Sequence, residues 1–174
     1  SSGTVSGDGT ITTGSQPVLP GAAGAGGHSI LAQNGKYLVV RGGATTLYVY
    51  DSLANSFTTS SQVLNAAAGA GAMSLPRADG RYLVLHGGGA TTNSIVDPTG
   101  TMAVGASVAS GAMNTGTNAF RRQNGRYLIL RGGAAATQLW DPSAAATSFV
   151  TGPNPTGTIG AGSLVLARQN GTAL

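Results

Sequence analysis

Three cationic or titratable residues occupy one recurring place, directly before a glycine pair: Arg41, His86 and Arg131. Around a ring of similar units, such groups could bind an anion or a glycan through charge-assisted hydrogen bonds. A structural alternative is that each side chain caps turn carbonyl groups, or bonds the aspartate ten or eleven residues further on, which is Asp51, Asp97 or Asp141. We favour the structural interpretation, because a buried arginine needs a partner of this kind.

A second set of arginines shares another recurring place, near the end of a short apolar run: Arg77, Arg122 and Arg168. Together they could line one face and hold phosphate or sulfate weakly. The alternative is that they are solvated charges, which keep a surface rich in alanine and glycine soluble. We expect the second role.

Catalytic and metal-binding arrangements are poorly supported. His28 and Ser29 are the residue types of a general base and a nucleophile, but neighbours on a strand point to opposite faces and cannot meet. Two histidines without clustered carboxylates fall short of a usual metal site. The chain has no cysteine, which removes thiol nucleophiles, disulfides and zinc–cysteine sites. We predict no enzymatic activity, no cofactor and no metal.

Two glycine-rich strings, at 21–27 and 87–89, superficially resemble phosphate-binding loops. Neither is followed by Lys-Ser or Lys-Thr, and neither opens a helix. They are expected to form tight turns and to allow close packing of backbone against backbone.

The recurring positions belong to an internal repeat of 45 residues. The string NGKYLVVRGG at 34–43 returns as DGRYLVLHGG at 79–88 and as NGRYLILRGG at 124–133. A fourth copy begins at Asn170-Gly171. A period of this length is typical of architectures that stack one supersecondary unit on the next.

Each repeat is predicted to contain four strands. In the first copy, Asn34-Gly35 forms a two-residue hairpin turn, because both residues tolerate positive φ. The strands are expected at 28–33, 36–41, 47–50 and 57–64. The alanine runs are too short to nucleate a helix, so almost no helix is expected. Four short strands per repeat are typical of a β-propeller blade.

The order of the motifs resembles a kelch repeat. Gly-Gly-His-Ser at 26–29, Asn-Gly-Lys-Tyr, the glycine doublet, Tyr50-Asp51 and Phe57 follow one another as they do in that family. Trp140-Asp141 in the third copy also resembles a WD40 blade. The resemblance covers essentially the whole chain and implies a propeller, although it implies no single function. His28 becomes Met73 and then Asn118, so the blades are degenerate.

The fold class is therefore all-β, with three full blades of four antiparallel strands and two complementary half-blades. The predicted units are a half-blade at 1–20, blades at 26–65, 71–110 and 116–152, and a half-blade at 160–174. The half-blades could join within the chain to close a four-bladed ring, the chain could be a window on a longer propeller, or the ends could exchange strands between copies. The interface between blades should contain Tyr37, Leu38, Val39, Val40, Leu83, Val84, Leu85, Leu128, Ile129 and Leu130.

Composition and charge narrow the classes of partner that the chain could bind. Among 174 residues, 8% are charged and 41% are apolar, and the formal net charge is +4. Arg121-Arg122 is the only adjacent basic pair, whereas a nucleic-acid binder shows clustered basic residues with interleaved aromatics. No uninterrupted apolar stretch reaches 18 residues, so membrane insertion is not expected.

These features favour a non-enzymatic structural or binding module of an extracellular, cell-surface or virion-surface assembly, such as an appendage, a fibre or a decoration. Its partners would be proteins, either copies of itself or a surface assembly, with a glycan as a further candidate. The alternative is a carbohydrate-binding propeller, or the propeller domain of a carbohydrate-active enzyme. An intracellular kelch adaptor would need a partner domain that these residues do not contain.

Overall fold

The computed structural model describes residues 3–5, 11–13, 17–32, 35–99, 108–109, 111–143 and 148–163. All regular structure within these ranges is strand, which confirms the predicted all-β class. The strands are β1 (Gly3–Val5), β2 (Ile11–Thr13), β3 (His28–Leu31), β4 (Lys36–Val40), β5 (Thr46–Asp51), β6 (Ser56–Val63), β7 (Met73–Pro76), β8 (Tyr82–Leu85), β9 (Thr92–Val96), β10 (Val108–Ala109), β11 (Asn118–Arg121), β12 (Tyr127–Leu130), β13 (Thr137–Trp140) and β14 (Phe149–Thr151).

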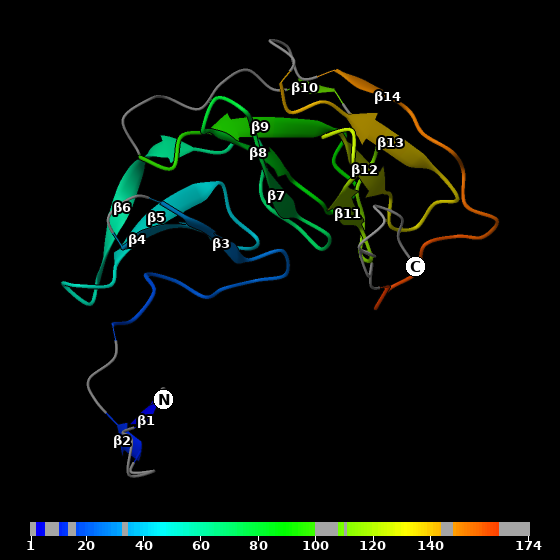
Figure 1. Ribbon diagram of the computed structural model, residues 1–174. Coiled ribbons are helices and arrows are strands. Elements are labelled where there is room, and N and C mark those ends of the chain that lie inside the picture. Colours follow the sequence, from blue (N-terminus) through cyan, green and yellow to red (C-terminus); the bar gives the residue numbers. More distant parts are fainter. Residues whose placement is uncertain are drawn as a thin grey trace.

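Twelve of these strands form three antiparallel sheets, each of four strands in chain order. We call them blade 1 (β3–β6), blade 2 (β7–β10) and blade 3 (β11–β14). They stand side by side along an arc, with β3, β7 and β11 on its inner side and β6, β10 and β14 on its outer side (Figure 1). This is the arrangement of propeller blades, and it confirms the predicted four-stranded units.

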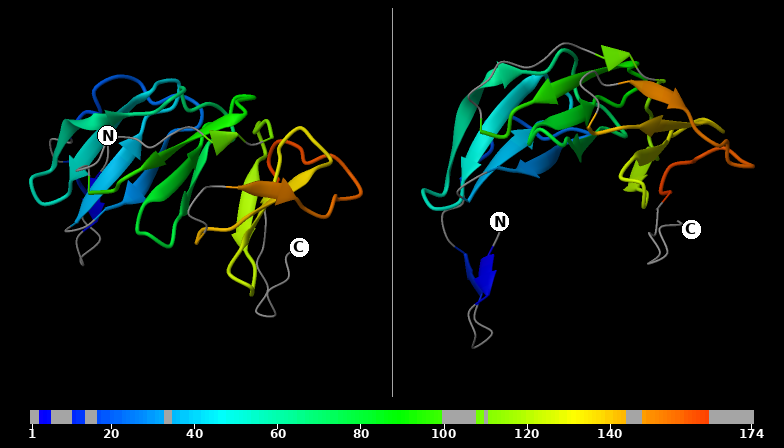
Figure 2. Two further views of the ribbon diagram at one scale, coloured as in Figure 1. Left: turned by 90° about the horizontal axis from the view of Figure 1, so that it is seen from above. Right: turned by 45° about the horizontal axis from the view of Figure 1, so that its top comes forward.

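The predicted half-blades are only partly within the described residues. Strands β1 and β2 pair with each other, and this hairpin stands apart from the blades in Figure 1 and in the right view of Figure 2. Residues 164–174, with Arg168 and the fourth repeat start at Asn170-Gly171, lie outside the described residues, as do residues 100–107 and 110 of the predicted blade 71–110. The joining of the two half-blades stays a prediction.

Two apolar cores hold the blades together, and alternation along each second strand decides which core a residue enters. Leu38 and Val40 of β4 point toward blade 2 and meet Val84 of β8. Leu83 and Leu85, on the opposite face of β8, meet Ile129 of blade 3. Blade 2 is therefore buried on both faces, which explains why its second strand is continuously apolar.

Most of the predicted interface residues lie in these cores, but those at the two ends of the arc do not. Tyr37 and Val39 are half-buried on the face of blade 1 that points away from blade 2. Leu128 and Leu130 are half-buried on the face of blade 3 that points away from blade 2. The prediction of full burial is wrong for these four, because the described residues include no further blade at either end.

The turn after each second strand is tied to the connector that leads into the next blade. The Gly43 N–H donates to the Ala68 carbonyl at 2.6 Å, and the Ala68 N–H donates back to the Ala44 carbonyl at 3.2 Å. The same reciprocal pair joins Gly89 and Ala90 to Met113, and Gly133 and Ala134 to Ile159. Blade 2 uses Gly89 because its turn contains one extra glycine.

A second repeated contact brings backbone against backbone. A Cβ on Gly26 would overlap the Gly69 carbonyl, and the same overlap occurs between Gly71 and Asn114 and between Gly116 and Gly160. All three glycines have positive φ, between 83° and 90°. Close packing was predicted for the glycine-rich strings, and these contacts confirm it. Only glycine satisfies both the backbone angle and the spacing between blades.

Replacing Gly71 by alanine should therefore destabilise the protein by about 3 kcal/mol, since strained backbone and steric overlap act together. Gly80→Ala is the matched control. Gly80 has nearly the same φ of 81°, but nothing lies within 4 Å of the added Cβ, so a loss of about 1 kcal/mol is expected. Chemical denaturation of both variants measures the difference. Equal losses would mean that the contact between blades is not a tight one.

Candidate functional site

The first set of predicted cations serves the fold. Arg41 Nη1 donates to the Pro20 carbonyl at 3.1 Å, and Arg131 Nε donates to the Ala112 carbonyl at 3.1 Å. Both arginines thus cap the connector that enters their own blade. His86 is fully buried and its Nε2 lies 2.7 Å from Ser94 Oγ. Capping of carbonyl groups was one of the expected roles, and Arg41 and Arg131 have it; an anion or glycan site at the three positions stays a prediction.

The expected bonds from Arg41 to Asp51 and from Arg131 to Asp141 were wrong, because other cations hold those two carboxylates. Lys36 Nζ lies 3.4 Å from Asp51, and Arg126 Nε lies 3.3 Å from Asp141. Lys36 begins β4 and pairs across the sheet with Asp51 at the end of β5. Arg126 directly precedes β12, and Asp141 directly follows β13. Sequence reasoning had missed the two cations, although position 36 and its repeat equivalents are always basic.

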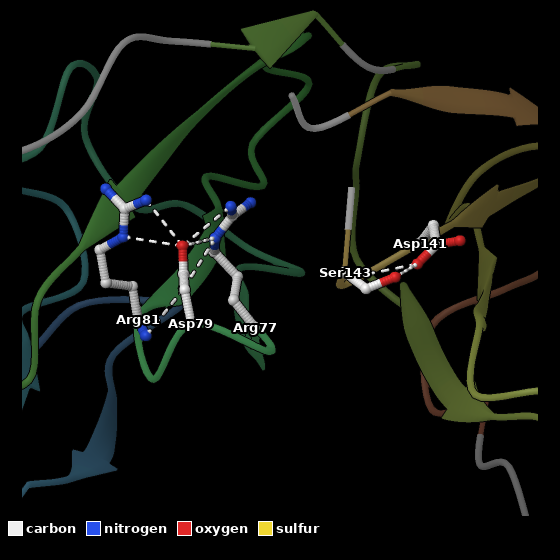
Figure 3. Close-up of polar contacts among 5 residues, drawn as sticks. All are labelled: Arg77, Asp79, Arg81, Asp141 and Ser143. Carbon is white, nitrogen blue, oxygen red and sulfur yellow. Dashed lines mark hydrogen bonds and ion pairs between the residues drawn. The ribbon is translucent and has the colours of Figure 1, made fainter. Parts of the chain in front are cut away.

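Arg77 is not a solvated charge. Only 3% of its side chain is exposed, and Asp79 accepts hydrogen bonds from its Nε at 3.1 Å and its Nη2 at 3.0 Å. Asp79 also accepts two from the Arg81 guanidinium, so one carboxylate lies between two cations (Figure 3). Arg122, its repeat equivalent, is exposed. The two described arginines at this repeat position therefore differ in environment, since Arg77 is buried and Arg122 is exposed.

The position of Asp79 between two guanidinium groups determines the pKa of its carboxyl group. Partial burial acts to raise the pKa of Asp79, but hydrogen bonds from Arg77 and Arg81 hold the pKa far below its usual range. The carboxylate is thus ionised throughout the physiological range and cannot serve as a general acid.

His28 bridges two blades on the inner side of the arc. Its Nδ1–H donates to the Gly26 carbonyl at 2.9 Å, and its Nε2 accepts from Ser74 Oγ of blade 2 at 2.6 Å. Burial lowers the pKa of His28, although the bond to Gly26 acts in the opposite direction. Asn118 repeats the pattern in blade 3, donating to the Gly116 and Ser163 carbonyls. Ser29 lies on the other face of β3, as alternation requires.

Within the described ranges, no three His, Cys, Asp or Glu side chains gather as metal ligands. The same part of the chain contains no helix long and apolar enough to cross a membrane.

A concave surface lies on the face of blade 1 that points away from blade 2, and sequence reasoning missed it. We call it the aromatic groove; it has a volume of about 420 Å³ and is lined by Leu19, Ser29, Tyr37, Val39, Tyr50, Ser52 and Phe57. Tyr37 pairs with Tyr50, and Tyr50 with Phe57, directly across neighbouring strands. Their ring centroids lie 6.3 and 4.9 Å apart. The sequence did carry a signal for this groove, because Tyr37, Tyr50 and Phe57 fall at facing positions of three neighbouring strands.

Comparisons with known proteins add little beyond the fold. No protein-family model matches the chain, and no curated protein matches it. A solved structure described as YCF48 bound to D1 peptide, from a β-propeller protein, is similar with a TM-score of 0.44 and 14% identity. The match covers 71% of this chain and 38% of that one, so the present chain spans well under half the length of its structural neighbour.

Asp79→Asn should destabilise the protein by about 3 kcal/mol, because the buried guanidinium of Arg77 loses its counter-charge. Asp141→Asn is the matched control. Asn keeps an acceptor for the Ser143 N–H, and only an exposed ion pair is lost, so a much smaller effect is expected. Urea denaturation at pH 7 compares the two, and a control that is equally damaged would contradict this account.

Stability should decrease as the pH falls from about 7.5 to 5. Burial lowers the pKa values of His28 and His86 in the folded state, while in the unfolded state they titrate near 6.5. The unfolded chain therefore takes up protons first and is favoured at low pH. His28→Asn should flatten this dependence without much loss at pH 8, because Asn118 makes equivalent bonds. Melting curves at four pH values test this, and an unchanged slope in His28→Asn would count against it.

Proposed function

We propose that the chain is a non-enzymatic structural and binding module, built of kelch-like blades, in an extracellular or virion-surface assembly. Its partner is a protein that docks in the aromatic groove of blade 1. The observation that carries the proposal is this groove, in which three aromatic rings and two aliphatic side chains gather in one concave surface. Aromatic residues in a concave, partly desolvated site are the usual anchors of protein interfaces.

The use of the acidic residues supports a non-enzymatic role. Four of the five acids hold local turns. Asp51 accepts from the Leu53 and Ala54 N–H groups, Asp97 from Thr99, and Asp141 from Ser143 (Figure 3). Asp79 accepts from Arg81 and neutralises Arg77. Each carboxylate is committed to the fold at its own hairpin, and none lines the groove.

Composition supports the location. The chain combines few charges with abundant small residues and no cysteine, and its repeated backbone contacts leave short, tight turns. With nine lysine and arginine residues among 174, the chain offers few cleavage sites to trypsin-like proteases. The kelch assignment is supported by the order of the glycine, tyrosine and aspartate motifs in each repeat.

Antibody labelling of intact and permeabilised cells, or of purified particles, tests the location. We expect labelling without permeabilisation. Recovery of the protein as a soluble cytosolic monomer would contradict the proposal.

Tyr50→Ala tests the groove. Truncation of a central aromatic anchor should weaken association with the assembly about tenfold or more. Leu53→Ala is the control, because Leu53 is 89% exposed in the turn after β5 and lies outside the groove lining. Equal retention of both variants on the assembly would argue against the groove as the contact.

A carbohydrate is the second candidate ligand. Tyr37 and Tyr50 could stack on a sugar ring, and the hydroxyl groups of Ser29 and Ser52 could accept or donate hydrogen bonds. A glycan array with wild type and Tyr50→Ala separates the candidates. A saturable sugar ligand that the variant loses would favour this reading over a protein partner.

A further inference from the structure

The face that carries the aromatic groove is the uncovered copy of a face that is buried elsewhere. Val84 and Ile129 occupy the repeat position of Val39, and both are fully buried against the preceding blade. Tyr50 corresponds in the same way to Val96 and Trp140, which are also fully buried. Val39 and Tyr50 themselves are half-buried. Among the described residues, no blade covers this face of blade 1, although its sequence positions are those of an interface between blades.

In the two existing interfaces, the covering face has a fixed composition. The face that covers Val84 is formed by Ile30, Leu38 and Val40. The face that covers Ile129 contains Leu75, Leu83 and Leu85. The repeat therefore defines what fits the groove: an apolar residue in the first strand of a blade, and two more in its second strand.

Both ends of the arc already continue the repeat beyond the three blades. Leu19 lies at the rim of the groove, one repeat before Leu64, which is buried between blades 1 and 2. At the other end, Ile159 and Gly160 make the contacts with blade 3 that mark the entry to a next blade. Residues 17–20 thus occupy the repeat position of a blade's last strand, and residues 159–163 occupy the position of the segment that enters a blade's first strand.

These two segments correspond to different strands of one blade, so both could belong to the same blade without occupying the same position. They lie at opposite ends of the arc, with blade 2 between them (Figure 2). The segment after Gly160 also carries the required residues, since Leu166 and Leu174 fall at the repeat positions of Phe120 and Leu128.

We propose that copies of this chain associate head to tail by completing a shared blade. Residues 160–174 of one copy dock on the aromatic groove of the next copy, beside that copy's residues 17–20. The contact is heterologous, so repetition gives either a closed ring or a filament. This inference rests on the proposed function and names the partner at the groove.

The absence of cysteine allows a direct test by disulfide formation. In the double variant Val39→Cys with Leu166→Cys, each copy carries both halves of the contact. Oxidation should give dimers and higher multimers on a non-reducing gel. Leu53→Cys with Leu166→Cys controls for random collision, because Leu53 points into solvent, and it should stay largely monomeric. A cross-link within one chain, or none above the control, overturns the proposal.

Light scattering of the wild-type chain over a concentration series gives an independent readout. The mass should increase with concentration, and Val39→Asp should remain monomeric while Leu53→Asp behaves as wild type. Circular dichroism confirms that the variants are folded. A wild-type chain that stays monomeric, yet labels at the surface and needs Tyr50 for attachment, would overturn this inference and leave the proposed function standing.

Discussion

The fold depends on the approach of one backbone to another where consecutive blades meet. At Gly26, Gly71 and Gly116 there is no room for a side chain between the turn and the carbonyl group of the next connector. This contact fixes the spacing of the blades, and the reciprocal hydrogen bonds of the second turn hold the connector in place. With the spacing fixed, the second strand of the middle blade buries both of its faces in the two apolar cores. Apolar burial supplies the stability, but glycine determines the geometry in which it occurs.

Charge has a local role in this molecule. Arg77 is buried beside a carboxylate two residues away in the same hairpin, and the repeat aspartates hold turns and exposed lysine or arginine partners. Such pairs satisfy the backbone and guanidinium groups that the tight turns leave without partners. The lining of the groove is instead mostly aromatic and aliphatic, together with the hydroxyl groups of Ser29 and Ser52.

The 45-residue period and the Gly-Gly doublets were sufficient to predict the strands, the four-stranded blades and the tight glycine contacts. The partners of the charged residues were harder to predict. Arg77 shares its repeat position with Arg122 and Arg168, which suggested one common role for the three. Its partner Asp79 lies in the following turn, where the other copies have asparagine, so the pairing is particular to this blade. The groove was missed for a different reason. Tyr37 and Val39 have the residue types of an internal interface, and periodicity cannot distinguish a covered blade from a terminal one.

The extra glycine at 87–89 shows where this architecture tolerates a change of length. The turn absorbs the added residue, and Gly89 still reaches Met113, whereas one residue added inside a strand would exchange the faces of every residue after it. Within the described residues, the two apolar cores join each blade to its neighbour along the chain, as in other repeat proteins. Unequal recombination between the near-identical second strands would therefore add or remove one whole blade and reproduce the existing junctions. On an evolutionary scale, the number of blades is easier to change than the sequence of any one interface.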